Sequence, residues 1–281
     1  MENGIGYIAV FFCVLFWGSY LVPAKRFPHC SPWYFQWLVS LGAVLSSVPI
    51  LFFRGWTFSW LGLSSGVVWS IGSILSLAAV QKSGLALSAS AWVGTGIITS
   101  CLSGMAVSGE TFGSPVLGIL GLTLLTGFLI LIARLNANTE STVRIRIHPA
   151  APLTGIVFGA YMVPLKPSGL DGIDFIPSMA LGILLAGIAL KLIVRPKVTP
   201  EARRWGIFSG VLWNGGNLLG LVAVKALGLM IAYPLIQSAL FIAILWGVVL
   251  YGELPGRAKR IRLFVYAAGL VTGAILIGFA G

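Results

Sequence analysis

A few uncharged polar side chains lie inside long apolar stretches of this 281-residue chain. Asn214 and Asn217 are three residues apart, and a helix would place them on one face. Ser70 and Ser73 have the same spacing in an earlier stretch, and Gln237 lies in a later one. Amides and hydroxyls both donate and accept hydrogen bonds, so this set suits a neutral ligand rich in hydroxyl groups. Alternatively, these groups only bond neighbouring helices to one another.

Aromatic side chains lie at similar depth in the apolar stretches. Trp69 and Trp213 fall in the middle of two stretches, and Trp17 and Trp92 also lie well inside. A buried indole can stack on the apolar face of a hydroxylated ring while its N–H donates a hydrogen bond. Packing in the helix core explains the same positions without a ligand.

Two tyrosines each precede a Val-Pro pair. Tyr20 comes shortly before Pro23, and Tyr161 comes shortly before Pro164. Because proline lacks an N–H and disrupts the helix it enters, both sites are candidate hinges or gates.

Two lysines and two glutamates are candidate gating or coupling residues. Lys25 and Lys166 follow the two prolines, while Glu110 and Glu253 each follow a glycine at the end of an apolar stretch. A Lys–Glu ion pair that forms at only one face of the membrane would favour one conformational state. Alternatively, the lysines only extend to the membrane surface. No Asp or Glu lies in mid-stretch, which weakens the case for proton coupling and leaves facilitated diffusion open as an alternative, although either glutamate could carry a proton.

The composition decides the class of protein. Apolar residues make up 58% of the chain and charged residues 9%, with a mean hydropathy of +0.98. These values exclude a soluble domain, a disordered chain, a collagen and a disulfide scaffold, and leave an all-α polytopic membrane protein. The net charge of +11 comes from short basic loops, so no nucleic-acid partner is expected. The three cysteines and two histidines form no ligand pattern, so we predict no metal and no cofactor.

The apolar stretches predict ten transmembrane helices. Their ranges are 4–24, 33–53, 60–80, 86–108, 114–134, 150–166, 174–194, 204–224, 230–251 and 261–280. Fifteen of the 18 basic residues fall on one side of this arrangement. The positive-inside rule places that side in the cytoplasm and both chain ends outside it, in a cell membrane.

The two halves of the chain resemble one another. Residues 17–25 (WGSYLVPAK) match residues 158–166 (FGAYMVPLK) at five of nine positions, and residues 65–85 match residues 209–229 at eleven of 21. We therefore divide the chain into repeats at 1–140 and 141–281. Five helices is an odd number, so the second repeat must be inverted relative to the first, as in many secondary transporters.

These segments also resemble a known family. FWGSYLVPAK (16–25), PWYFQW (32–37) and YPLIQSALFIAILWGVVLYGE (233–253) are similar to the glucose/ribose porter and transmembrane carbohydrate transporter branch of the drug/metabolite transporter superfamily. The resemblance implies a fold of two inverted five-helix repeats and uptake of a sugar or polyol, often with proton symport.

We therefore predict a secondary transporter that moves a neutral sugar or related polyol by alternating access. The alternatives are an uncoupled sugar carrier, a drug, metabolite or amino-acid exporter of the same fold, and a passive channel. An enzyme is not expected, because the chain has no H-E-x-x-H motif and no nucleophile–histidine pair. The expected partners are a sugar-like solute and the lipid bilayer. The protein is a monomer, or a homodimer through Gly269 and Gly273.

Overall fold

The computed structural model describes residues 2–108, 112–135, 147–194, 199–227, 232, 235–254 and 256–280. Every regular element among these residues is helical. The longer helices are α1 (Glu2–Ser19), α3 (Pro32–Arg54), α4 (Trp60–Ser83), α5 (Leu85–Ser108), α6 (Pro115–Arg134), α9 (Gly172–Ile193), α10 (Pro200–Leu227) and α13 (Arg257–Ala280). The shorter ones are α2 (Val22–Arg26), α7 (Ala150–Ala160), α8 (Leu165–Ser168), α12 (Ala239–Leu245) and the π-helical turn η1 (Trp246–Leu250).

Eight of the described helical segments are long and apolar enough to cross a membrane. They match all of the ten predicted segments except those at 150–166 and 230–251. The chain is therefore an integral multi-pass membrane protein. In the two remaining regions the helices are shorter: α7 has 11 residues, and the apolar helix Leu235–Leu250 includes η1. The count of ten spans stays a prediction.

Proline interrupts two predicted helices. A continuous helix over 150–166 is wrong, because α7 ends at Ala160 and the four-residue α8 begins only at Leu165, directly after Pro164. In the first span, α1 ends at Ser19 and α2 begins at Val22, with Pro23 in its first turn. Proline cannot donate the N–H that would continue the preceding helix, so the chain breaks at both places.

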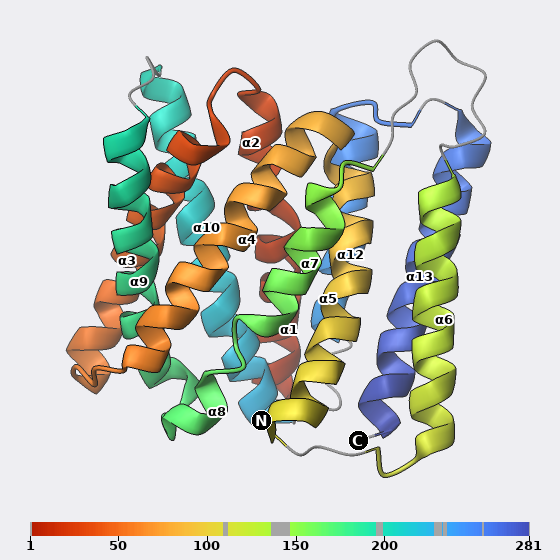
Figure 1. Ribbon diagram of the computed structural model, residues 1–281, viewed down its shortest axis with the longest axis horizontal. Helices are drawn as coiled ribbons and strands as arrows, with labels where there is room; N and C mark the ends of the chain where they lie inside the picture. The colour runs from red at the N-terminus through yellow and green to blue at the C-terminus, as the bar shows by residue number, and fades with distance from the viewer. Residues whose placement is uncertain are drawn as a thin grey trace.

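The helices stand side by side, with α3 and α9 at one edge and α6 and α13 at the other (Figure 1). Helix α1 begins and α13 ends at the same end of the bundle, which we call the terminal end. The opposite end holds α2, the turn between α4 and α5, and the start of α10. We call it the basic end, because most of the described lysines and arginines belong to segments that meet there.

Glycines allow two pairs of helices to touch along their backbones. Gly42 and Gly210 bring α3 against α10, and Gly66 and Gly182 bring α4 against α9. At each of the four, an added Cβ would lie 2.0 Å from a backbone carbonyl oxygen of the facing helix. The facing carbonyls belong to Ile207, Val39, Met179 and Leu63, in the order of the glycines above. Any larger side chain would force these helices apart.

Gly269 and Gly273, the glycines of the possible dimer contact, face helix α6 of the same molecule. A Cβ on Gly269 would meet the ring of Phe128, and one on Gly273 would meet Leu125 and the carbonyl of Gly121. All three neighbours belong to α6, so these glycines pack α13 against α6 within one molecule.

Candidate functional site

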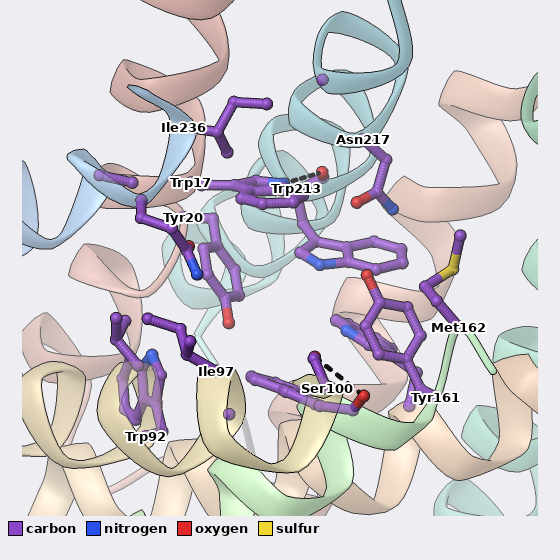
Figure 2. A pocket seen from close by; sticks show the side chains of 18 of the residues that line it. Trp17, Tyr20, Trp92, Ile97, Ser100, Tyr161, Met162, Trp213, Asn217 and Ile236 are labelled. Carbon is purple, nitrogen blue, oxygen red and sulfur yellow. Dashed lines mark hydrogen bonds between the residues drawn. The ribbon is translucent and has the colours of Figure 1, made fainter. Parts of the chain in front are cut away.

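A cavity of about 330 Å³ lies among α1, α4, α5, α7, α9, α10 and the segment around α12. Small-molecule sites typically have volumes of ~300–1,000 Å³. The described residues that line it include no charged side chain. Eight of the side chains predicted to bind a ligand are among them: Trp17, Tyr20, Trp69, Trp92, Tyr161, Trp213, Asn217 and Gln237. Figure 2 shows six of these labelled around the open space.

Three aromatic rings from different helices form a stack at this wall. The ring centroids of Trp69 and Trp213 are 3.7 Å apart at an interplanar angle of 33°. Phe158 lies almost parallel to Trp69, with centroids 6.1 Å apart. Trp69 and Trp213 are almost fully buried, so the stack is a rigid surface formed by α4, α10 and α7. Such a surface offers a flat apolar face to a ring-shaped solute.

Trp17 lies across the cavity wall beside Trp213. Its indole Nε1 donates a hydrogen bond to the backbone carbonyl of Trp213, 3.2 Å away (Figure 2). This bond orients the Trp17 ring and ties α1 to α10. Gly216 leaves the space for it, because an added Cβ there would lie 2.2 Å from the Trp17 ring.

The two helix breaks free backbone carbonyls near the cavity. In a continuous helix, the N–H groups of Ala24 and Leu165 would donate to the carbonyls of Tyr20 and Tyr161. Here they donate instead to the carbonyls of Leu21 and Met162, so the two tyrosine carbonyls lose their helical donors. Serine hydroxyls replace them. Ser209 of α10 donates to the Tyr20 carbonyl, and Ser65 of α4 donates to the Tyr161 carbonyl. The tyrosine side chains are thereby held at the cavity wall.

Amide and hydroxyl groups supply the polar part of the wall. Asn217 and Gln237 line it from α10 and from the segment that precedes α12. Ser100 lines it from α5 and donates to the carbonyl of Gly159, 3.0 Å away. The arrangement can exchange hydrogen bonds with solute hydroxyls and stack on a ring, and it provides no counter-charge for an ion.

Three other predicted binding residues lie away from this cavity. The Asn214 amide faces α3, where it donates to the hydroxyls of Ser46 and Ser47 at 3.0 Å each. Ser70 donates to the carbonyl of Gly66, one turn earlier in its own helix. Ser73 donates to the side-chain oxygen of Gln36 on α3. Of these four Asn and Ser residues, Asn217 alone lines the cavity in this conformation.

The basic end of the bundle is closed by an ion pair. Lys25 Nζ lies 3.3 Å from Glu253 Oε1. The same carboxylate accepts hydrogen bonds from the N–H groups of Leu85 at 2.7 Å and Ala86 at 2.8 Å, the first residues of α5. One side chain thus joins α2, α5 and the segment after η1.

A tyrosine adds a second link at this closure. The Tyr251 hydroxyl donates to the carbonyl of Val22 at 2.5 Å.

Of the second predicted Lys–Glu pair, only Lys166 is placed. It lies in the short helix α8 at the terminal end, and Glu110 lies outside the described residues.

Some residues of the site escape sequence reasoning. Phe158 and Ser100 line the cavity, but nothing in their immediate sequence separates them from ordinary core residues. Ser65 and Ser209 carried a usable signal, because they are the first matched positions of the aligned segments 65–85 and 209–229.

The chain is similar to known proteins over nearly its whole length. The chain is 23% identical to the glucose uptake protein GlcU of Bacillus subtilis, over 95% of both chains, and 23% identical to the transmembrane protein 144 homolog B of Dictyostelium discoideum, over 98% of both. A solved crystal structure superposes with a TM-score of 0.65 over 97% of both chains at 13% identity, which shows a shared fold.

A family model described as sugar transport protein matches residues 8–280, nearly the whole chain. This match confirms the resemblance to carbohydrate transporters seen in the sequence. The chain belongs to the sugar transport protein family.

Proposed function

We propose that the protein carries a neutral sugar or related polyol across a membrane by alternating access. The observation that carries this proposal is the uncharged aromatic and amide-lined cavity inside a bundle of membrane-crossing helices. The indole stack would hold the apolar face of the sugar ring, while Asn217 and Gln237 would bind its hydroxyls. Relatives named as glucose and sugar uptake proteins support the same solute class.

The two repeats at 1–140 and 141–281 would form inverted halves around this cavity. Their matched serines support this arrangement, because Ser65 of the first half binds the Tyr161 carbonyl of the second, and Ser209 binds the Tyr20 carbonyl of the first. Inverted halves can exchange conformations, which gives a carrier two mirror-related states. Ten spans in total, including α7 and the segment around α12, complete the proposed fold.

The described conformation would be one of these two states. The Lys25–Glu253 ion pair closes the basic end, and the buried side chains of Leu21, Ala24 and Leu85 lie close to it in the chain. Among the helices that line the cavity, α10 and α7 run on from it toward the terminal end. With the basic end in the cytoplasm of a cell, as the positive-inside rule requires, the site would face outward.

The uncharged cavity favours an uncoupled carrier. A proton-coupled site normally contains a buried carboxylate that binds the proton near the solute. Glu253 is the described carboxylate that could couple a proton, from the closure at the basic end.

Uptake by liposomes tests the proposal. The purified protein is reconstituted, and uptake of a panel of labelled sugars is measured with and without an inward proton gradient. We expect saturable uptake and counterflow of at least one sugar, with the same rate in both conditions. Acceleration by the gradient would establish symport instead. Absence of uptake of every sugar, in vesicles where a control carrier is active, would refute sugar transport and favour an exporter of the same fold.

A further inference from the structure

The glycine contacts between helices fix how the two repeats correspond. Gly66 touches the carbonyl of Met179, and Gly210 touches the carbonyl of Val39. Adding 144 to a residue number in α4 gives its counterpart in α10, so Gly66 corresponds to Gly210. Adding 140 to a residue number in α3 gives its counterpart in α9, so Val39 corresponds to Met179. The contacts of Gly42 with Ile207 and of Gly182 with Leu63 obey the same two offsets.

This correspondence pairs positions that line the cavity with positions that do not. Ile176, Asn217 and Gly220 line the cavity. Their counterparts in the first repeat are Gln36, Ser73 and Ser76, which lie outside the set of residues that line it. The two sets therefore occupy equivalent positions in the two repeats, but only the set in the second repeat lines the cavity.

The closed set is a buried polar cluster. Gln36, Ser73 and Ser76 are all fully buried. Ser73 donates to the Gln36 side-chain oxygen, and Ser76 donates to the Ser73 carbonyl at 2.7 Å. The Gln36 Nε2 atom has no hydrogen-bond partner among the described residues. Burying an amide N–H without a hydrogen-bond partner costs free energy. We therefore infer that this group has a hydrogen-bond partner in another conformation of the protein.

The cluster also touches the present cavity. The side chain of Tyr20, which lines the cavity, lies close enough to Ser76 to interact with it. Tyr20 is the counterpart of Tyr161, which lines the same cavity from the second repeat. The path from the cavity toward the basic end thus continues through hydroxyl and amide groups.

We propose that Gln36, Ser73 and Ser76 form a second solute subsite, which opens to the basic end when the present cavity closes. This inference rests on the proposed function. In that state the free Gln36 amide hydrogen donates to a solute hydroxyl, and the two serine hydroxyls complete the contacts. The subsite has an amide and two hydroxyls where the present cavity has Asn217 alone at the equivalent positions. At these three matched positions the subsite therefore offers more hydrogen-bonding groups than the present cavity does.

Cysteine accessibility tests whether the cluster opens. Cys13, Cys30 and Cys101 are first changed to serine, and Ser73→Cys is added to this background. Membrane-impermeant maleimide is applied to inside-out and right-side-out vesicles. Lys25→Gln breaks the ion pair at the basic end while leaving Glu253 on α5. We expect labelling of S73C only from the basic-end side, with a rate that rises about tenfold in the Lys25→Gln background.

Two matched positions serve as controls. Asn217→Cys, the counterpart that lines the present cavity, should be labelled from the opposite side. Ser47→Cys, buried at the contact between α3 and Asn214, should stay unlabelled from both sides. If S73C fails to react from the basic-end side in both the Lys25 and the Lys25→Gln backgrounds, the proposal is overturned.

Protection by solute tests whether the open cluster binds it. In the Lys25→Gln background, a transported sugar should slow the labelling of S73C. Gln36→Leu should raise the half-protecting concentration by about fivefold to tenfold, as expected for loss of one hydrogen bond. Gln81→Leu removes an amide that binds the Cys30 carbonyl outside the cluster and should leave that concentration unchanged. Equal effects of both substitutions would overturn the subsite.

The two proposals can fail separately. The labelling of S73C needs no solute, so it reports opening of the cluster alone. Absence of sugar uptake by the wild-type protein would refute the proposed function. Sugar uptake together with an unreactive or unprotected S73C would refute the subsite.

Discussion

Replacement of Glu253 by alanine should destabilise the protein more than loss of a surface ion pair would. The Glu253 carboxylate accepts two backbone hydrogen bonds at the start of α5, at 2.7 and 2.8 Å, and pairs with Lys25 at 3.3 Å. Each hydrogen bond to a charged acceptor contributes about 1.5 kcal/mol. The Lys25 side chain is 25% exposed, so the ion pair adds about 1 kcal/mol. We therefore expect Glu253→Ala to cost about 4 kcal/mol of unfolding free energy.

Lys25→Met isolates the contribution of the ion pair. In this variant Glu253 keeps both N–H donors, so the expected loss is about 1 kcal/mol. Adding Lys25→Met to Glu253→Ala should cost nothing further, because the pair is already broken. The double-mutant cycle should therefore give a coupling energy of about 1 kcal/mol.

Reversible unfolding in mixed micelles measures these values. Titration with sodium dodecyl sulfate is followed by tryptophan fluorescence and by far-ultraviolet circular dichroism. A loss for Glu253→Ala no larger than that for Lys25→Met would refute the role of Glu253 as the cap of α5. Full additivity of the two losses would refute the ion pair.

Three further outcomes follow from the packing and the chemistry of single residues. Trp213→Ala should raise the half-saturating sugar concentration in counterflow by about tenfold, while Trp205→Ala, outside the cavity, should leave it unchanged. Gly210→Val should lower the unfolding free energy by about 3 kcal/mol or prevent assembly, whereas Gly127→Ala, with open space around its Cβ position, should not, as unfolding titrations would show. Burial raises the pKa of the Cys30 thiol to about 11. Because the thiolate is the reactive form, a variant that retains only this cysteine should react slowly with maleimide at pH 7 and faster as the pH rises toward 11. A reaction rate already maximal at pH 8 would contradict this burial.

The sequence predicts the eight long membrane-crossing helices of the described residues, because hydrophobic stretches of this length leave the backbone little choice but a helix in lipid. It fails where a helix must break. Pro164 pointed to a hinge, but hydropathy alone extended the helix to residue 166, whereas α7 ends at Ala160. Hydropathy counts apolar residues and is blind to the missing proline N–H.

The site was predicted less completely than the fold. Spacing placed Asn214 and Asn217 on one face of α10, but positions three apart still differ by ~60° around a helix. That difference turns Asn214 toward α3 and Asn217 toward the cavity. No local pattern shows which neighbour a helix face meets, since Ser46 and Ser47 lie more than 160 residues away in the chain.

The exchanged serine contacts bear on how such a protein could have arisen from two copies of one ancestral segment. Each half leaves one carbonyl, that of Tyr20 or Tyr161, to be satisfied by a hydroxyl of the other half. A single half expressed alone would leave its carbonyl without this hydroxyl donor. We therefore expect the two proposed repeats to act as obligate partners, so that neither is a stable fragment when expressed by itself.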